Sequence, residues 1–123
     1  MRILIVLEGL ELEAELDSSN TAKAIYQILP IESSISFWGD EIYFPIDVSL
    51  PPENARDDLE IGDIAYWPDG RCFCIFYGKT PASFDDKPRP ASPVNVFGRI
   101  HAGSERLKNI KADKILIEKL EDG

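Results

Sequence analysis

The chain has 123 residues, enough to close one hydrophobic core, and we expect a single domain over residues 1–123. Its composition, 44% hydrophobic and 28% charged, is typical of a folded globular protein and excludes a disordered one. The formal net charge of -9 argues against nucleic acid or an anionic membrane as a partner, because both bind positively charged surfaces.

The N-terminal third predicts two strands. Residues 2–7 are largely apolar, but this run is too short for the core of a signal peptide or for a membrane span, so we expect a cytoplasmic protein. Residues 10–16 alternate between apolar and acidic side chains, which is the pattern of a half-buried strand. A turn at residues 8–9 would join the two strands.

Two short helices are predicted. Residues 17–20 are rich in side chains that cap helix N-termini. Apolar side chains then recur with helical spacing as far as Pro30, at Ala22, Ile25, Tyr26 and Leu29. The second helix is expected over residues 104–110, where Leu107 and Ile110 share one side.

Elsewhere the sequence indicates strands and turns. Short β-branched or aromatic runs predict six further strands, at residues 34–38, 41–44, 63–67, 72–77, 94–100 and 114–120. Eight strands with two short helices predict a mainly β fold, a closed or nearly closed barrel with the helices capping its ends. Residues 47–59 and the proline-rich residues 79–93 are predicted as surface loops, and long loops often carry function.

Aromatic side chains are concentrated in the middle of the chain: nine of the twelve fall between Phe37 and Tyr77. They either fill the core or line a pocket. Trp38 and Tyr43 flank a predicted turn and would stack on a ring or peptide, with Glu41 as a polar anchor; the competing interpretation is that these aromatics alternate in and out of the core. Tyr66 and Trp67 are adjacent in a strand, so they must face opposite sides.

Polar residues give no recognisable catalytic or metal-binding set. Cys72 and Cys74 are one residue apart in a strand and are predicted to be buried, unreactive thiols. A disulfide between them would be strained, and a structural zinc site needs four ligands, so we expect no metal and no cofactor. Asn95 and the single histidine, His101, are the best polar candidates in the second half, but a lone histidine lacks the partner that a general base requires.

Residues 70–80 and 94–100 resemble the closing strands of cyclophilins. Taken together, residues 38–44, 62–70 and 94–100 resemble more closely a family of small prokaryotic cyclophilin-like proteins of unassigned function, and this resemblance covers nearly the whole chain. It implies a mainly β fold, a closed eight-stranded cyclophilin-like β-barrel capped by two short helices.

The resemblance to true cyclophilins does not extend to catalysis. Cyclophilins use an apolar proline pocket and an arginine, which the resemblance places at about residues 32–38, where this chain has no arginine or lysine. Losing such an electrostatic contact slows a reaction about a hundredfold or more. Cys72 and Cys74 also stand where cyclophilins have glutamine and phenylalanine, so the pocket is expected to be remodelled, with Trp67 as the candidate to fill it. We therefore assign no catalytic residue.

The favoured hypothesis is a domain that binds a peptide or a small molecule in an aromatic-lined groove without efficient catalysis. The predicted ligand-binding residues are Trp38, Glu41, Tyr43, Tyr66, Trp67, Cys74, Phe84 and Asn95. Two alternatives stay open: a weak peptidyl-prolyl isomerase in which Arg71 or Arg99 replaces the missing arginine, and a structural or assembly subunit whose pocket is an interface. The sequence leaves both the ligand and the oligomeric state open.

Overall fold

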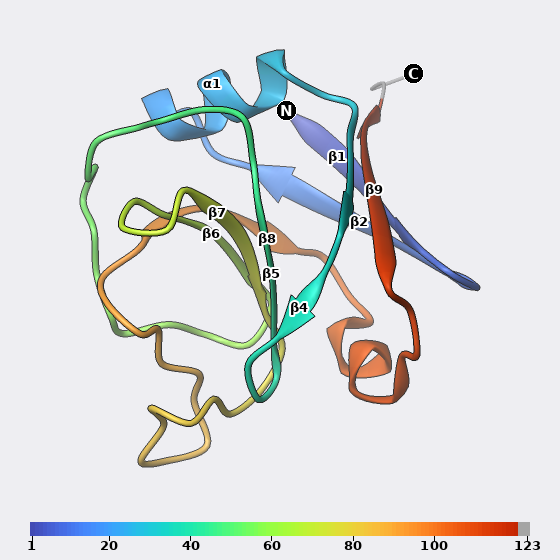
Figure 1. Ribbon diagram of the computed structural model, residues 1–123, viewed down its shortest axis with the longest axis vertical. Coiled ribbons are helices and arrows are strands. Elements are labelled where there is room, and N and C mark those ends of the chain that lie inside the picture. Colours follow the sequence, from blue (N-terminus) through green and yellow to red (C-terminus); the bar gives the residue numbers. More distant parts are fainter. Residues whose placement is uncertain (121–123) are drawn as a thin grey trace.

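The strands form one sheet that bends round until its two edges nearly meet (Figure 1). The computed structural model describes residues 1–120, in which nine strands follow the order β3-β9-β1-β2-β8-β6-β7-β5-β4. The strands are β1 (Arg2–Leu7), β2 (Leu10–Leu16), β3 (Ile31–Ser34), β4 (Ser36–Phe37), β5 (Glu41–Pro45), β6 (Asp63–Trp67), β7 (Cys72–Phe76), β8 (Asn95–Ile100) and β9 (Lys114–Leu120). The prediction of a mainly β, nearly closed barrel is confirmed.

The two edge strands explain both the near closure and the difference from the predicted eight strands. A single strand was expected at residues 34–38, but the structure has β3 and β4, separated only by Ile35. β3 pairs with β9 and β4 pairs with β5, so the chain passes directly from one edge of the sheet to the other. The split follows from pairing: each half of the segment takes its backbone hydrogen bonds from a different neighbour.

Two short helical segments accompany the sheet. Helix α1 (Asn20–Gln27) begins where predicted, because the side chain of Ser19 accepts a hydrogen bond from the backbone N–H of Ala22 at 3.0 Å. The second segment, η1 (Ser104–Asn109), is a 3₁₀ helix with Leu107 buried. Across residues 1–120, no helix is both long enough and apolar enough to span a membrane.

Strands β5 to β7 bury side chains on both faces. Inside the barrel, the ring of Phe73 stacks on Phe44 with centroids 5.1 Å apart and meets Phe97 edge-on at 5.4 Å. The opposite face carries a second buried cluster: Leu59, Ala65, Cys72, Cys74, Phe76 and Val94. Every residue of β7 is therefore buried. We call this second side the outer face; the candidate site lies on it.

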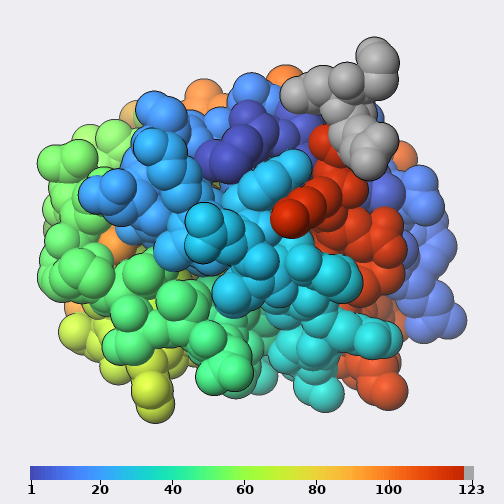
Figure 2. Space-filling view, turned by 90° about the horizontal axis from the view of Figure 1, so that it is seen from above, coloured from blue at the N-terminus to red at the C-terminus, as the bar shows by residue number. Residues whose placement is uncertain are grey.

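Residues 46–62, which connect β5 to β6, are held against α1 (Figure 2, green beside blue). The anchor is Asn95, which is 1% exposed. Its Oδ1 accepts the backbone N–H of Glu53 at 2.9 Å, and its Nδ2 donates to Oγ1 of Thr21 at 3.1 Å and to the carbonyl of Pro51 at 3.0 Å. The hydroxyl of Thr21 donates to Glu53 at 2.7 Å and lowers the pKa of that carboxyl. Asn95 thus closes a ring of hydrogen bonds between β8, the connection and the helix.

We expect Asn95→Ala to lower the free energy of unfolding by about 2 kcal/mol, because it removes three hydrogen bonds at a buried position. Urea unfolding followed by fluorescence measures the change. Asn109→Ala, at the exposed end of η1, is the matched control and should stay within about 0.5 kcal/mol of wild type. Equal effects of the two substitutions would show that the ring contributes no stability.

Candidate functional site

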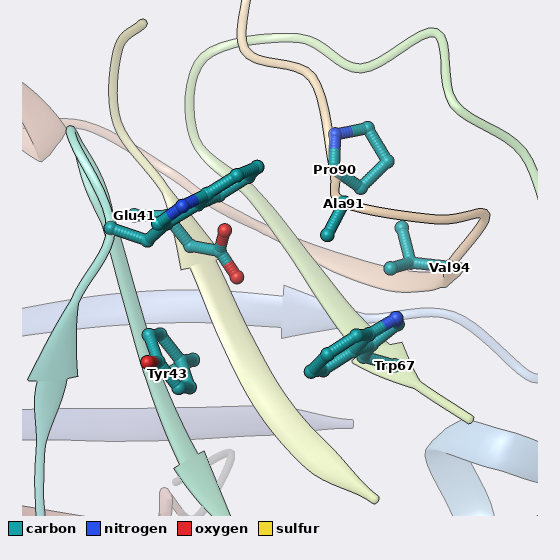
Figure 3. Close-up of a pocket in the computed structure, with 7 residues that line it drawn as sticks. Glu41, Tyr43, Trp67, Pro90, Ala91 and Val94 are labelled. Carbon is teal, nitrogen blue, oxygen red and sulfur yellow. The ribbon is translucent and has the colours of Figure 1, made fainter. Parts of the chain in front are cut away.

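A pocket of about 190 Å³ lies on the outer face, above β5 and β6 (Figure 3). Three segments far apart in the sequence supply its walls: the β4–β5 turn with β5, the end of β6, and the connection that leads into β8. The lining residues are Trp38, Glu41, Tyr43, Trp67, Pro90, Ala91 and Val94. All but Glu41 present apolar or aromatic surface, so the pocket suits an apolar or ring-shaped group.

The β4–β5 turn brings three lining residues together. Trp38 and Glu41 exchange backbone hydrogen bonds of 2.9 and 3.2 Å, which close a two-residue turn. Gly39 adopts φ +60° there, a conformation that glycine accepts without strain. Glu41 and Tyr43 are two residues apart on β5, so their side chains share the outer face.

Trp67 forms the opposite wall and ties the loop to the sheet. Its indole Nε1 donates to Oγ of Ser92 at 2.6 Å, and that hydroxyl donates to Oδ2 of Asp69 at 2.7 Å. The nitrogen lies on the side of the ring away from Glu41, so the carbon surface faces the pocket (Figure 3). The hydrogen bond to Ser92 also fixes the neighbouring residues Pro90, Ala91 and Val94, which complete the pocket.

Glu41 is the single charged residue among the lining side chains. It is 6% exposed, and its carboxylate points into the space between the labelled rings (Figure 3). Burial raises the pKa of Glu41 from its ordinary 4.5 to about 7, and a hydrogen bond with the thiol of Cys74 opposes part of that rise. Near neutral pH the side chain therefore exists in both protonated and ionised forms and can either donate or accept a hydrogen bond.

The two cysteines lie together on the outer face, and both are free and buried, as predicted. Cys74 is paired with Tyr43 across β5 and β7 and lies beneath the pocket. Burial raises the pKa of both thiols, that of Cys74 well above its usual value. They are therefore neutral and weakly nucleophilic. Within the described part of the chain, no group of three or more His, Cys, Asp or Glu side chains is placed to hold a metal ion.

The fold can be compared with known proteins. The family model described as Cyclophilin-like matches residues 1–118. This chain belongs to the cyclophilin-like family. The solution structure of the hypothetical protein AF2241 from Archaeoglobus fulgidus is similar, with 45% sequence identity and a TM-score of 0.82 over 98% of this chain and 95% of that chain. Among curated proteins, none matches the chain. The resemblance to small cyclophilin-like proteins is thereby confirmed at the level of family and fold.

Four of the eight predicted ligand-binding residues line the pocket of this cyclophilin-like protein, and Cys74 lies directly beneath them. The structure places the other three elsewhere. Tyr66 faces the barrel interior, opposite Trp67 as predicted, and its hydroxyl donates to the carbonyl of Val48 at 3.0 Å. Phe84 is 79% exposed and lies under the guanidinium of Arg89 at 4.4 Å. Asn95 belongs to the ring of hydrogen bonds that holds residues 46–62.

The contribution of the loop was missed. Pro90, Ala91 and Val94 line the pocket, whereas only Phe84 was selected from this region of the sequence. The available signal was the proline content of residues 79–93, because prolines restrict the backbone of a loop. The burial of Pro90 is seen only in the structure.

The basic residues considered for catalysis lie outside the pocket. Among the residues that line it, none is an arginine or a lysine. Arg71 is exposed in the β6–β7 turn, and Arg99 pairs with Asp63 at 3.1 Å. Neither Arg71 nor Arg99 is among the residues that line the pocket.

Proposed function

We propose that this cyclophilin-like protein is a binding domain that takes up one small molecule or one side chain of a peptide in the pocket, without efficient catalysis. The observation that carries the proposal is a preformed, largely apolar cavity with a single polar side chain directed into it. Binding sites in proteins have this composition: apolar walls and a few polar groups that fix orientation.

The size of the cavity limits the ligand. Pockets for drug-sized molecules measure roughly 300 Å³ or more. The volume of about 190 Å³ is smaller and suits one ring or one compact side chain. A larger ligand would leave most of its surface outside the pocket.

NMR provides the test, because both tryptophans of the chain line the pocket. We expect hits from a fragment screen to shift the two indole N–H resonances and to leave the amides of β1 unchanged. Tyr43→Ala should weaken those hits about tenfold, whereas Phe84→Ala, outside the pocket, should not. A screen in which no fragment moves either indole resonance would refute the proposal.

A weak prolyl isomerase is the second candidate, favoured by the small apolar pocket in a cyclophilin-like fold. The absence of a basic lining residue weighs against it, because no cation is placed to stabilise the twisted amide. A protease-coupled assay on a Xaa-Pro peptide separates the two candidates. We expect the uncatalysed rate, with relaxation over tens to hundreds of seconds. A rate that rises with protein concentration, and falls in Tyr43→Ala, would establish the isomerase instead.

A further inference from the structure

We infer that the pocket selects an alkylated ammonium group, with Glu41 as the counter-charge and the three aromatic rings as walls. The inference rests on the proposed binding function of the same pocket and adds the chemical class of the ligand.

The first observation is that Glu41 has no counter-ion. Two acidic side chains are buried in the described chain, Glu41 at 6% and Asp63 at 1% exposure. Asp63 is paired with Arg99 at 3.1 Å and also accepts the backbone N–H of Glu60 at 2.8 Å. No ion pair found within residues 1–120 includes Glu41. Buried charges in proteins are normally paired, so an unpaired carboxylate directed into a pocket indicates a cation from outside.

The second observation is the nature of the walls. Trp38, Tyr43 and Trp67 line the same pocket as Glu41. The electron-rich faces of aromatic rings attract cations within about 6 Å. The indole N–H of Trp67 is already used by Ser92, outside the cavity. The pocket therefore offers a cation one carboxylate and a wall of carbon surface.

This combination distinguishes between kinds of cation. A bare metal ion needs several oxygen or nitrogen ligands, and the described side chains provide no such cluster here. A primary ammonium or a guanidinium carries three or five N–H donors, and the lining side chains provide too few acceptors for them. An alkylated ammonium keeps the positive charge but replaces donors with methyl groups, which match the apolar walls.

The surrounding charges are compatible with a bound cation. The net charge of -9 favours the approach of cations to the whole molecule. The ionisable groups near Glu41 include Tyr43 on β5, Cys72 and Cys74 on β7, Asp40 in the turn, and Lys79 and Arg89 on the loop. The two basic ones are engaged away from the pocket: Lys79 pairs with Asp86 at 3.5 Å, and Arg89 donates to the carbonyl of Asp57 at 3.3 Å.

The decisive experiment compares choline with 3,3-dimethyl-1-butanol, a neutral molecule of the same shape, by titration calorimetry and by the indole resonances at pH 8. We expect wild type to bind choline about tenfold or more tightly than the neutral probe, and Glu41→Gln to abolish that preference. Tyr43→Leu, which keeps the apolar surface but removes the ring, should weaken choline alone. Phe84→Ala is the control and should match wild type. Sodium chloride, added to the same ionic strength as the choline chloride in the titration, should not displace choline.

Protonation gives an independent readout. Because burial raises the pKa of Glu41 to about 7, choline binding at pH 7 should release part of a proton, and choline binding to Glu41→Gln should release none. Calorimetric titrations in buffers of different ionisation enthalpy measure the number of protons released.

A peptide with trimethyllysine, compared with its unmethylated form, identifies the source of the alkylated ammonium group. Tighter binding of the peptide than of choline indicates a protein tail, and weaker or equal binding indicates a free small molecule.

Two results would overturn the inference. If both probes bind equally and Glu41→Gln changes neither, the pocket binds ligands without selecting cations, and the proposed function survives. If neither choline nor the methylated peptide moves an indole resonance, the cation is excluded; the fragment screen then decides separately whether the pocket binds anything.

Discussion

Replacing Glu41 with glutamine should make the protein more stable at pH 8 by about 3 kcal/mol and should have little effect at pH 4.5. The reason is the cost of ionising a buried carboxyl group. A rise in pKa from 4.5 to about 7 corresponds to about 3 kcal/mol between the protonated and ionised forms. Glutamine has nearly the same shape but never ionises, so it avoids this cost.

The sign follows from proton binding. Between pH 4.5 and 7 the folded state keeps the proton on Glu41, whereas the unfolded chain releases it. Raising the pH through this interval therefore favours the unfolded state, and the loss of stability is complete above pH 7. Most paired carboxylates behave in the opposite way, because their pKa values are lowered on folding.

Urea unfolding of both proteins between pH 4.5 and 8 measures the effect as a difference, in which the contributions of the other acidic groups cancel. Glu11→Gln is the matched control: it removes the same charge from an exposed position on β2 and should give a difference within about 0.5 kcal/mol and without a trend. If the curves for wild type and Glu41→Gln run parallel, Glu41 is ionised and solvated in the folded protein. The interpretation of Glu41 as an unpaired buried acid would then be wrong.

This cost has a functional meaning. A buried acid that lowers stability at neutral pH occupies a position where an apolar residue would pack. Strongly shifted pKa values of this kind cluster at functional sites, although structural networks also produce them. Within residues 1–120, the one side chain found hydrogen-bonded to Glu41 is the thiol of Cys74. A site for a cationic ligand accounts for both the missing partner and the aromatic surroundings.

The parts of the fold that follow from local rules could be predicted from the sequence. Residues 10–16 alternate because β2 buries one face only, and Ser19 begins α1 through its side-chain oxygen. Residues 31–34 could not be predicted as a strand, because their half-polar pattern is weak and their pairing with β9 depends on how the sheet closes. Such a strand is determined by tertiary structure and has no strong local signal.

Site residues could be predicted where a single strand or turn determines the direction of their side chains. Trp38, Glu41 and Tyr43 fall on one side because of the turn and the two-residue period of β5. Asn95 was selected for its polarity, yet its partners Thr21 and Glu53 lie 74 and 42 residues away, and no local pattern shows them. The walls formed by residues 90–94 depend on the loop's return path, which the hydrogen bond between Trp67 and Ser92 fixes only in the folded chain.

The second large effect is expected at Gly39, where alanine should lower the free energy of unfolding by about 3 kcal/mol. The left-handed backbone, with φ +60°, costs a residue with a Cβ about 1 kcal/mol. The remainder comes from overlap: a Cβ at this position would lie 2.8 Å from the carbonyl oxygen of Lys79 and 2.9 Å from the Cα of Thr80. Both are backbone atoms, so the turn and the start of the loop would have to separate.

Gly9→Ala separates these two causes. Gly9 occupies the turn between β1 and β2 with φ +76°, and a Cβ there would meet nothing within 4 Å. It should therefore cost about 1 kcal/mol, from the backbone conformation alone. Urea unfolding of the two variants gives the difference, and the indole resonance of Trp38 should move in Gly39→Ala but not in Gly9→Ala. Equal losses would mean that the turn is not packed against residues 79–80. Unequal losses with a displaced indole would show that this contact holds the tryptophan wall of the pocket in place.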